Sequence, residues 1–232
     1  MQHYAEHPTI QLEPSSQKIR IACWHVVEEF VDSIGKPSLS LEDVDRDICR
    51  KYINFCRNLK NHRVKDVVKD LSQNTKDRYQ QGLISALNHA VREGIISINP
   101  FALIPSEEKI SDKDGEREFL TIQELKKLID TPCTREDVKV AFLFSCYTGL
   151  RMSDVRVLNA SHICLSPDGK HEYIDMIMVK TDMQVVVPLS TEAKKWLPKQ
   201  SEPDKPFFTL PAKATVSRAI DGWVKAAGIK KH

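Results

Sequence analysis

The chain has 232 residues, of which 41% are hydrophobic and 28% charged, and its formal net charge is +2. This composition is typical of a soluble globular protein that can bury one or two cores, and the length favours two domains. The longest apolar runs are too short to span a bilayer and the N-terminus has no signal-peptide pattern, so we expect a cytoplasmic protein without a membrane segment. The small net charge does not by itself indicate a nucleic-acid binder.

The cysteines occur without any CxxC spacing, at Cys23, Cys49, Cys56, Cys133, Cys146 and Cys164. The pattern predicts neither a zinc site nor a disulfide framework. Because most of these residues stand in apolar or helical contexts, we expect them to be buried free thiols.

The first half of the chain predicts helices only. Apolar residues with three-four spacing indicate a first helix that Ser15 or Ser16 caps and that Gly35 ends. A second helix is predicted from residue 41 or 44 to 59. A third follows Asn74 and Thr75 and ends near residue 94.

The second predicted helix separates apolar from basic side chains. Arg46, Arg50 and Arg57 fall within about 40° of one another, opposite the apolar side. Between residues 46 and 65 the chain carries seven basic residues and one acidic residue, Asp47. One face of this helix is therefore expected to pack, and the other to present guanidinium groups.

A polar, charged stretch over residues 107–118 predicts an interdomain linker. We therefore expect a first domain over residues 1–106 and a second over residues 119–232. The second domain opens with Thr121-Ile122-Gln123-Glu124, a capping box that begins a helix.

The rest of the second half predicts more helices around one hairpin. Residues 138–147 are nearly all apolar and indicate a central core helix that Gly149 ends. Residues 173–189 predict a β-hairpin, with β-branched arms around Lys180-Thr181-Asp182-Met183. Helices resume at 191–197 and 215–227. The fold class is therefore mainly α with a small antiparallel β-sheet.

Arg151 stands between the glycine turn and a short helix that Ser153 can cap. This position fixes a guanidinium group beside helix N-terminal amides, which suits a phosphate. The alternative is an arginine that stabilises the turn by pairing with Asp154 or Asp175.

Lys180 is expected in the hairpin turn. A lysine there can reach into a minor groove or approach the leaving oxygen of a phosphodiester. Since a lysine in a hairpin turn is usually just solvated, only the combination of Arg151 and Lys180 indicates a phosphate site.

Four separated segments, taken in their order along the chain, resemble those of one known family. They are NTKDRYQQGLISALNHAVREGIISINPF, FLTIQEL, YTGLRMSDV and VKTDMQVVVPLS. Together they resemble the tyrosine recombinases, or phage integrases, and in particular the mobile-element integrases of Bacteroides-like bacteria. The resemblance covers the chain from about residue 10 onward. It implies an all-helical SAM-like core-binding domain, followed by a partial α+β catalytic domain.

The resemblance also implies roles for three residues. Arg151 matches the first catalytic arginine, which holds the scissile phosphate. Lys180 matches the hairpin lysine, a general acid that protonates the departing 5′ oxygen. Asp154 matches an acidic position that supports the site, although a simple helix-start carboxylate explains it equally well. No metal or other cofactor is implied, because the arginines and the lysine supply the positive charge.

Other family residues have no match in the chain. The resemblance implies an HxxR box with a second arginine, then a His or Trp, and then a nucleophilic tyrosine, after a helix like 215–227. The sequence ends at His232, and none of its five tyrosines matches the nucleophile. An additional arm-site DNA-binding domain before the core-binding domain also has no match. We therefore expect a chain shortened at both ends, with DNA binding and half of an active site but no activity of its own.

The leading hypothesis is site-specific DNA recombination or integration, by strand breakage and rejoining through a phosphotyrosine intermediate in the complete family member. The two domains are expected to form a clamp around double-stranded DNA. The first domain is expected to contact phosphates through a basic patch, which we define as Arg46, Arg50, Arg57, Lys60, Arg63, Lys65, Lys76 and Arg78. For any single member, a plain solvated face is the alternative.

Two other functions stay open. A catalytically inert DNA-binding remnant or regulator would share the fold, and a helical adaptor without a nucleic-acid role would fit the low net charge. Complete relatives act as tetramers on paired DNA sites. Their subunit exchange uses a C-terminal tail, so stable assembly of these 232 residues is not expected.

Overall fold

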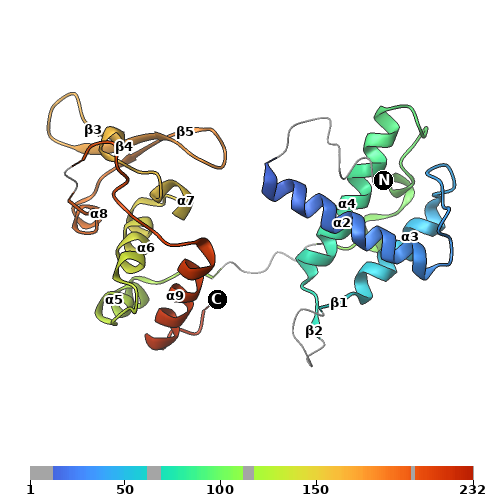
Figure 1. The fold of residues 1–232 in the computed structure, drawn as a ribbon, viewed down its shortest axis with the longest axis horizontal. Helices are drawn as coiled ribbons and strands as arrows, with labels where there is room; N and C mark the ends of the chain where they lie inside the picture. Colours follow the sequence, from blue (N-terminus) through green and yellow to red (C-terminus); the bar gives the residue numbers. More distant parts are fainter. Residues whose placement is uncertain (1–12, 62–68, 112–117, 200–201, 232) are drawn as a thin grey trace. The chain divides into compact units, whose positions relative to one another are not determined.

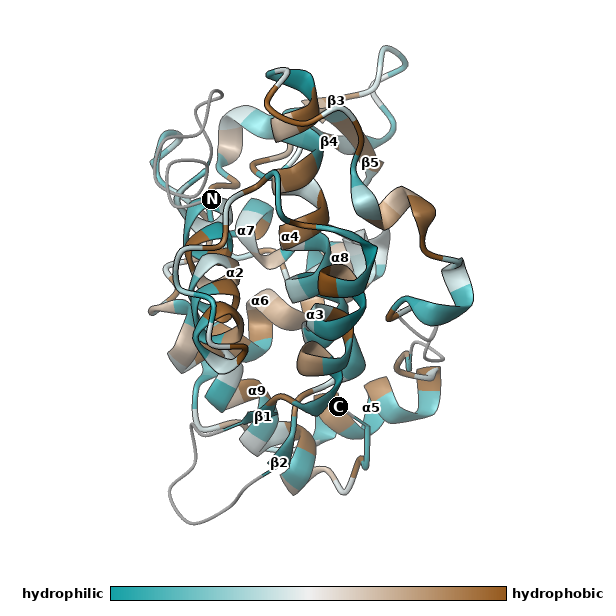
Figure 2. Ribbon diagram, turned by 90° about the vertical axis from the view of Figure 1, so that its right-hand side faces the viewer, coloured by the Kyte–Doolittle hydropathy of each residue, from teal (hydrophilic) through white to brown (hydrophobic). Residues whose placement is uncertain are grey.

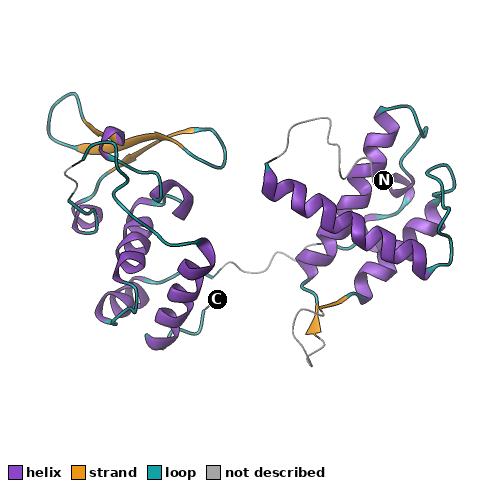
Figure 3. Cartoon of the chain, in the orientation of Figure 1, coloured by secondary structure: helices purple, strands orange, loops and turns teal. Residues whose placement is uncertain are grey.

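The computed structural model describes residues 13–61, 69–111, 118–199 and 202–231. The chain forms two compact units, residues 1–115 and 116–232 (Figure 1). Helices predominate in the described residues, and the strands form a two-stranded ladder and a three-stranded sheet, both antiparallel (Figure 3). The predicted fold class is confirmed. Within the described residues, no helix is long and apolar enough to cross a bilayer.

Three long helices build the first unit: α2 (Pro14–Ser33), α3 (Arg46–Asn58) and α4 (Gln73–Arg92). Both α2 and α3 pack against α4. Two short antiparallel strands, β1 (Lys60–Asn61) and β2 (Lys69–Asp70), lie between α3 and α4 in the sequence. Hydrophilic and hydrophobic residues alternate along these helices, as Figure 2 shows.

The core of the first unit forms around Tyr52 of α3, which is fully buried. The Phe30 ring of α2 meets the Tyr52 ring edge-on, with 5.2 Å between centroids. The Tyr52 hydroxyl donates a hydrogen bond of 3.1 Å to the Tyr79 carbonyl of α4, so the buried polar group is satisfied. One aromatic side chain therefore links all three helices.

After α4 the chain returns over the helices through two 3₁₀ turns, η1 (Pro100–Leu103) and η2 (Ser106–Glu108). Gln80 is fully buried, and its side-chain amide donates to the Ile110 carbonyl (3.1 Å) and accepts from the Ile110 amide (2.8 Å). Residues 106–110, which we name the strap, are thereby fixed to the first unit. The start of the predicted linker, 107–118, is thus packed structure, because the Glu108 side chain binds Arg50 of α3 and the Ile110 backbone binds Gln80 of α4.

The second unit contains α5 (Ile122–Asp130), α6 (Glu136–Thr148), α7 (Met152–Val155), α8 (Thr191–Lys195) and α9 (Lys213–Ala226). As predicted, the apolar helix α6 is central, and it packs against α7, α8 and α9.

Two side chains join α9 to the region between α5 and α6. The Trp223 indole donates a hydrogen bond of 2.9 Å to the Thr131 carbonyl. Buried Lys139 of α6 donates to the carbonyls of Ile129 (2.7 Å) and Thr131 (3.1 Å), and its ammonium lies 5.6 Å from the Trp223 ring centroid. Carbonyls at the end of α5 are thereby satisfied.

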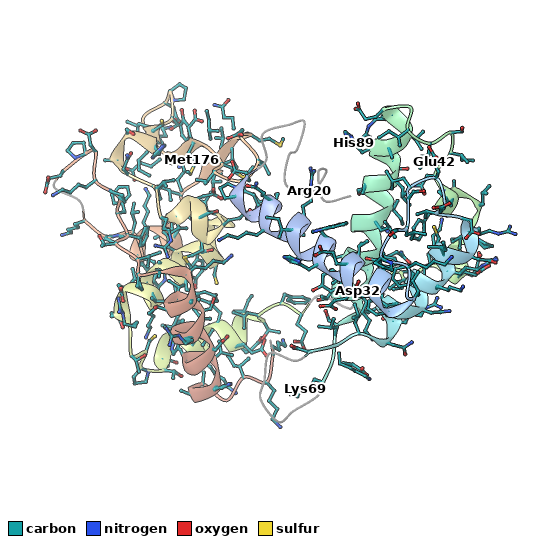
Figure 4. The ribbon with its side chains drawn as sticks, turned by 45° about the vertical axis from the view of Figure 1, so that its right-hand side comes forward. Arg20, Asp32, Glu42, Lys69, His89 and Met176 are labelled. Carbon is teal, nitrogen blue, oxygen red and sulfur yellow. The ribbon has the colours of Figure 1, made fainter. Side chains whose placement is uncertain are left out.

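The sheet of the second unit has the order β3 (Ile163–Leu165), β4 (Glu172–Ile177), β5 (Gln184–Pro188). The predicted β4–β5 hairpin is confirmed, with Asp175 opposite Val186. Met176, labelled in Figure 4, is buried on the core face of β4. The sequence did not indicate β3, because three residues are too few to display an alternating pattern.

Helix ends test the local predictions. Thr121 and Glu124 form the predicted capping box at the start of α5, and Gly149 ends α6 in a left-handed conformation with φ 71°. The prediction that Ser153 caps α7 is wrong, because the N-cap is Arg151, without a side-chain cap hydrogen bond.

Candidate functional site

The turn between α6 and α7 fixes the backbone of Arg151. The Gly149 amide donates to the Ser145 carbonyl (2.8 Å), and the Ser145 hydroxyl donates to the Leu150 carbonyl (2.6 Å). Leu150 is buried in the core of the second unit. Because hydrogen bonds and a buried side chain hold the turn on both sides of the glycine, the position of Arg151 at the start of α7 is well defined.

The guanidinium group of Arg151 is exposed. Its Nη1 atom lies 3.2 Å from the sulfur of Met178, at the end of β4. Arg151 has no ion pair with any described carboxylate. Asp175, one of the partners considered from the sequence, instead accepts a hydrogen bond of 2.8 Å from the Gln184 amide. The Arg151 guanidinium group is therefore open to an external anion.

Asp154 connects α7 to the hairpin. Its side chain is fully buried, and Oδ1 accepts a hydrogen bond of 2.9 Å from the Val179 amide. Its other oxygen, Oδ2, is buried without a hydrogen-bond partner among the described residues. A buried carboxylate with one unsatisfied oxygen is costly, and the bond to the Val179 amide gives Asp154 a contact beyond its own helix start.

Lys180 follows Val179 directly, in the turn between β4 and β5. The turn is closed by hydrogen bonds from the Met178 amide to the Met183 carbonyl (2.9 Å) and from the Asp182 amide to the Met178 carbonyl (3.0 Å). Asp182 adopts a left-handed φ of 51°. The Lys180 side chain is exposed and forms no ion pair with a described residue.

The structure therefore brings together the three site residues predicted in the second half. Arg151 touches the residue two positions before Lys180, and Asp154 binds the residue immediately before it. Two cations without described ion pairs on neighbouring segments, with a buried carboxylate that orients one segment, have the charge and donors that a phosphate group requires.

The predicted basic patch of the first unit has a different environment. Arg50 is half-buried and forms a two-pronged ion pair with Glu108 of the strap, with distances of 2.7 and 2.9 Å. Arg57 donates to the Glu108 carbonyl (2.7 Å) and to the Asn54 side chain (3.1 Å). The face of α3 expected to be a free guanidinium surface thus binds the strap.

The remaining members of the patch differ in their environments. Lys60 pairs with Asp70 at 2.6 Å. Lys76 is buried, contrary to its expected place on the surface, because its ammonium donates to the Arg57 carbonyl at 2.6 Å. Arg46 and Arg78 are exposed. The last two members, Arg63 and Lys65, lie outside the described residues.

Local sequence patterns do not indicate the partners that bind these cations. Glu108 and Gln80 stand 58 and 30 residues from Arg50 and Ile110, respectively. Glu108 also lies in a stretch whose polar composition predicted a linker. These contacts could have been predicted only by knowing which residues of α3, α4 and the strap lie next to one another.

Comparison with protein families provides independent evidence on the first unit. Residues 1–110 match the family described as Phage integrase SAM-like domain. The matched region spans α2, α3, α4 and the whole strap, and the SAM-like fold expected of the first domain is confirmed. A comparison with curated protein sequences gives no match.

Solved structures share the fold of the phage integrases across both units. A lambda integrase(75-356) dimer bound to a COC′ core site matches with a TM-score of 0.74 and 18% identity, over 99% of this chain and 77% of that chain. The Tn1549 transposon integrase, in complex with circular intermediate DNA, gives 0.63 and 14%, over 96% and 75%. XerH site-specific recombinase bound to difH substrate gives 0.62 and 14%, over 93% and 63%. The fold is therefore that of integrase core-binding and catalytic domains.

Proposed function

We propose that this chain carries the DNA-binding function and half of the active site of a tyrosine recombinase of the mobile-element integrase type, whose complete members act in site-specific DNA recombination by strand breakage and rejoining. One observation carries the proposal: buried Asp154 holds the Val179 amide, so that the Lys180 turn stays beside α7 and Arg151. The SAM-like match of residues 1–110 and the integrase fold support it.

In this proposal, Arg151 binds non-bridging oxygens of the scissile phosphate and stabilises the charge that develops on the pentacovalent transition state. Lys180 donates a proton to the departing 5′ oxygen, a step that typically contributes roughly 10²- to 10⁴-fold in rate. Asp154 is a positioning residue that acts through the hairpin backbone. The absence of a described carboxylate partner for Arg151 and Lys180 favours this role over an inert DNA-binding protein.

The proposed partner is double-stranded DNA in the cytoplasm, bound by both units. Solved relatives include a lambda integrase tetramer bound to a Holliday junction. We propose assembly on paired DNA sites for the complete family member, since strand exchange joins two DNA sites and needs more than one copy of the protein. Stable assembly of these 232 residues alone is not expected.

The proposal is tested by measuring duplex affinity at 50 and 200 mM salt, using duplexes selected from a random pool and scrambled versions of them. We expect steep salt dependence, with a loss of roughly 10³-fold or more if six or more phosphates are contacted. We also expect selected duplexes to bind at least about 10³-fold tighter than scrambled ones. Arg151→Ala should weaken binding, whereas Arg135→Ala, which removes an arginine already paired with Asp137, should not. Salt-insensitive or absent binding would contradict the proposal.

The chemical step is tested with a suicide substrate that carries a nick beside the selected site. We propose that none of the five tyrosines of this chain is the nucleophile, so the 232 residues alone should give no covalent protein–DNA product. A covalent product that disappears on mutation of one tyrosine would overturn this part of the proposal and identify the nucleophile.

A further inference from the structure

Glu108 of the strap lies among three arginines of α3. Its two carboxylate oxygens accept hydrogen bonds from Nε and Nη2 of Arg50, and its main-chain carbonyl accepts one from Arg57. The Arg50 hydrogen bond, reinforced by the charges of Arg50, Arg46 and Arg57, lowers the pKa of the Glu108 carboxyl. The Glu108 carboxylate thus lies in a local cationic site, where Asp47 is a second carboxylate, with its Oδ1 3.8 Å from Nη1 of Arg50.

The geometry of this site suits a phosphodiester as well as a carboxylate. The planar guanidinium group presents parallel donors that bind either anion in the same two-pronged way. Arg50, Ile53, Asn54, Arg57 and Glu108 line a surface hollow of about 180 Å³. Asn54 and the Lys76 ammonium, which donates to the Arg57 carbonyl, hold Arg57 in place.

The Glu108 carboxylate is accessible to a competing anion. The exposed fraction of its side chain is 40%, and that of the Arg50 side chain is 36%. Because water screens both charges at this degree of exposure, the ion pair is weak enough for another anion to compete with it. The strap is also anchored by Gln80 at Ile110, so release of Glu108 from Arg50 does not require the strap to detach.

We propose that Glu108 is an internal competitor at a phosphodiester-binding site formed by Arg46, Arg50 and Arg57, and that duplex DNA displaces its carboxylate. This inference rests on the proposed function, because it takes duplex DNA as the ligand. It assigns the basic face of α3 two exclusive partners: the strap carboxylate in the free protein and a DNA phosphate in the complex. The displacement makes DNA affinity lower than the arginine cluster alone would provide.

The test compares Glu108→Gln with Glu107→Gln in the whole chain. Both changes remove one negative charge from η2, but only Glu108 binds an α3 arginine, whereas Glu107 accepts a hydrogen bond from Ser106. We expect Glu108→Gln to bind duplex DNA roughly three- to tenfold tighter than Glu107→Gln, since no carboxylate has to be displaced from Arg50 before a phosphate binds there. Equal affinities for the two variants overturn the inference.

A double variant and a wild-type measurement complete the test. In the Arg50→Ala background, Glu108→Gln should bring no gain, because the released guanidinium group is absent; a gain that persists contradicts the competition. In the unmutated chain, which avoids any folding defect, the Arg50 Nε–H resonance should shift when duplex DNA is added, and an unchanged resonance at saturation overturns the inference. If neither the wild type nor Glu108→Gln binds duplex DNA, the proposed function itself is wrong.

Discussion

Two arginine-bearing regions of this molecule use the same side chain in opposite ways. Arg151 has a rigid backbone and an exposed guanidinium group that touches only a methionine sulfur among the contacts described. Arg50 and Arg57 of α3 bind the strap through charged and neutral oxygens. The guanidinium group of Arg151 is therefore available to an external anion, whereas Arg50 already binds the Glu108 carboxylate of the same chain.

The difference shows that the density of basic residues does not measure the capacity to bind DNA. Between residues 46 and 65 the chain is strongly basic, yet the described cations there are largely committed to carboxylates and carbonyls. The α7 and hairpin region has few cations, but those are free of described ion pairs. Availability follows from which partners the fold brings near, because a paired guanidinium group must exchange one anion for another.

The largest change in stability is expected for Gln80→Ala. The change leaves the buried amide and carbonyl of Ile110 unsatisfied, which should lower the free energy of unfolding of the first unit by about 2–4 kcal/mol. Thermal unfolding together with hydrogen exchange at the Ile110 amide measures the loss. Gln81→Ala is the matched control, since Gln81 is exposed and contacts only the Asp77 side chain among the bonds described. Similar stabilities for the two variants would show that the strap is not anchored at Gln80.

A smaller effect is expected at Asp154→Ala in the second unit. Its loss frees the Val179 amide, but that segment is partly exposed to water, so the expected cost is about 1–2 kcal/mol. Hydrogen exchange at residues 178–183 should accelerate. DNA affinity should fall, because Lys180 is no longer held in position.

Asp175→Ala is the control for this variant, because Asp175 contacts the Gln184 side chain rather than the turn backbone. If hydrogen exchange in the hairpin turn is the same in Asp154→Ala as in the unmutated chain, Asp154 does not position the turn. The contrast between a preorganised site in the second unit and an occupied one in the first would then no longer hold.

Much of the secondary structure could be predicted from local patterns. The capping box at Thr121 and Glu124, the left-handed Gly149 and the β4–β5 hairpin all follow from interactions within a few residues of one another. The predictions were wrong or incomplete where a segment was too short to show a pattern, or where neighbouring residues could each cap the same helix. Ser153 is a good cap by type, yet the N-cap is Arg151, two residues earlier, and the helix begins at Met152. The three residues of β3 were too few to show a period.

The candidate site was predictable in part for the same reason. Arg151 and Lys180 were singled out by their places beside a glycine turn and in a hairpin turn, and the sequence suggested that they act in combination. What it did not contain was the connection between them. That connection is the hydrogen bond from the Val179 amide to Asp154, which joins residues 25 positions apart.

Residue type and short-range spacing were enough to predict most of the helices and the hairpin, their apolar faces, and the basic residues located in turns. Tertiary structure decided which of those cations remain available. Glu108 reaches Arg50 across 58 residues and Gln80 holds Ile110 across 30. Such pairings arise only when helices pack, since the partners are separated by whole elements that no local periodicity connects.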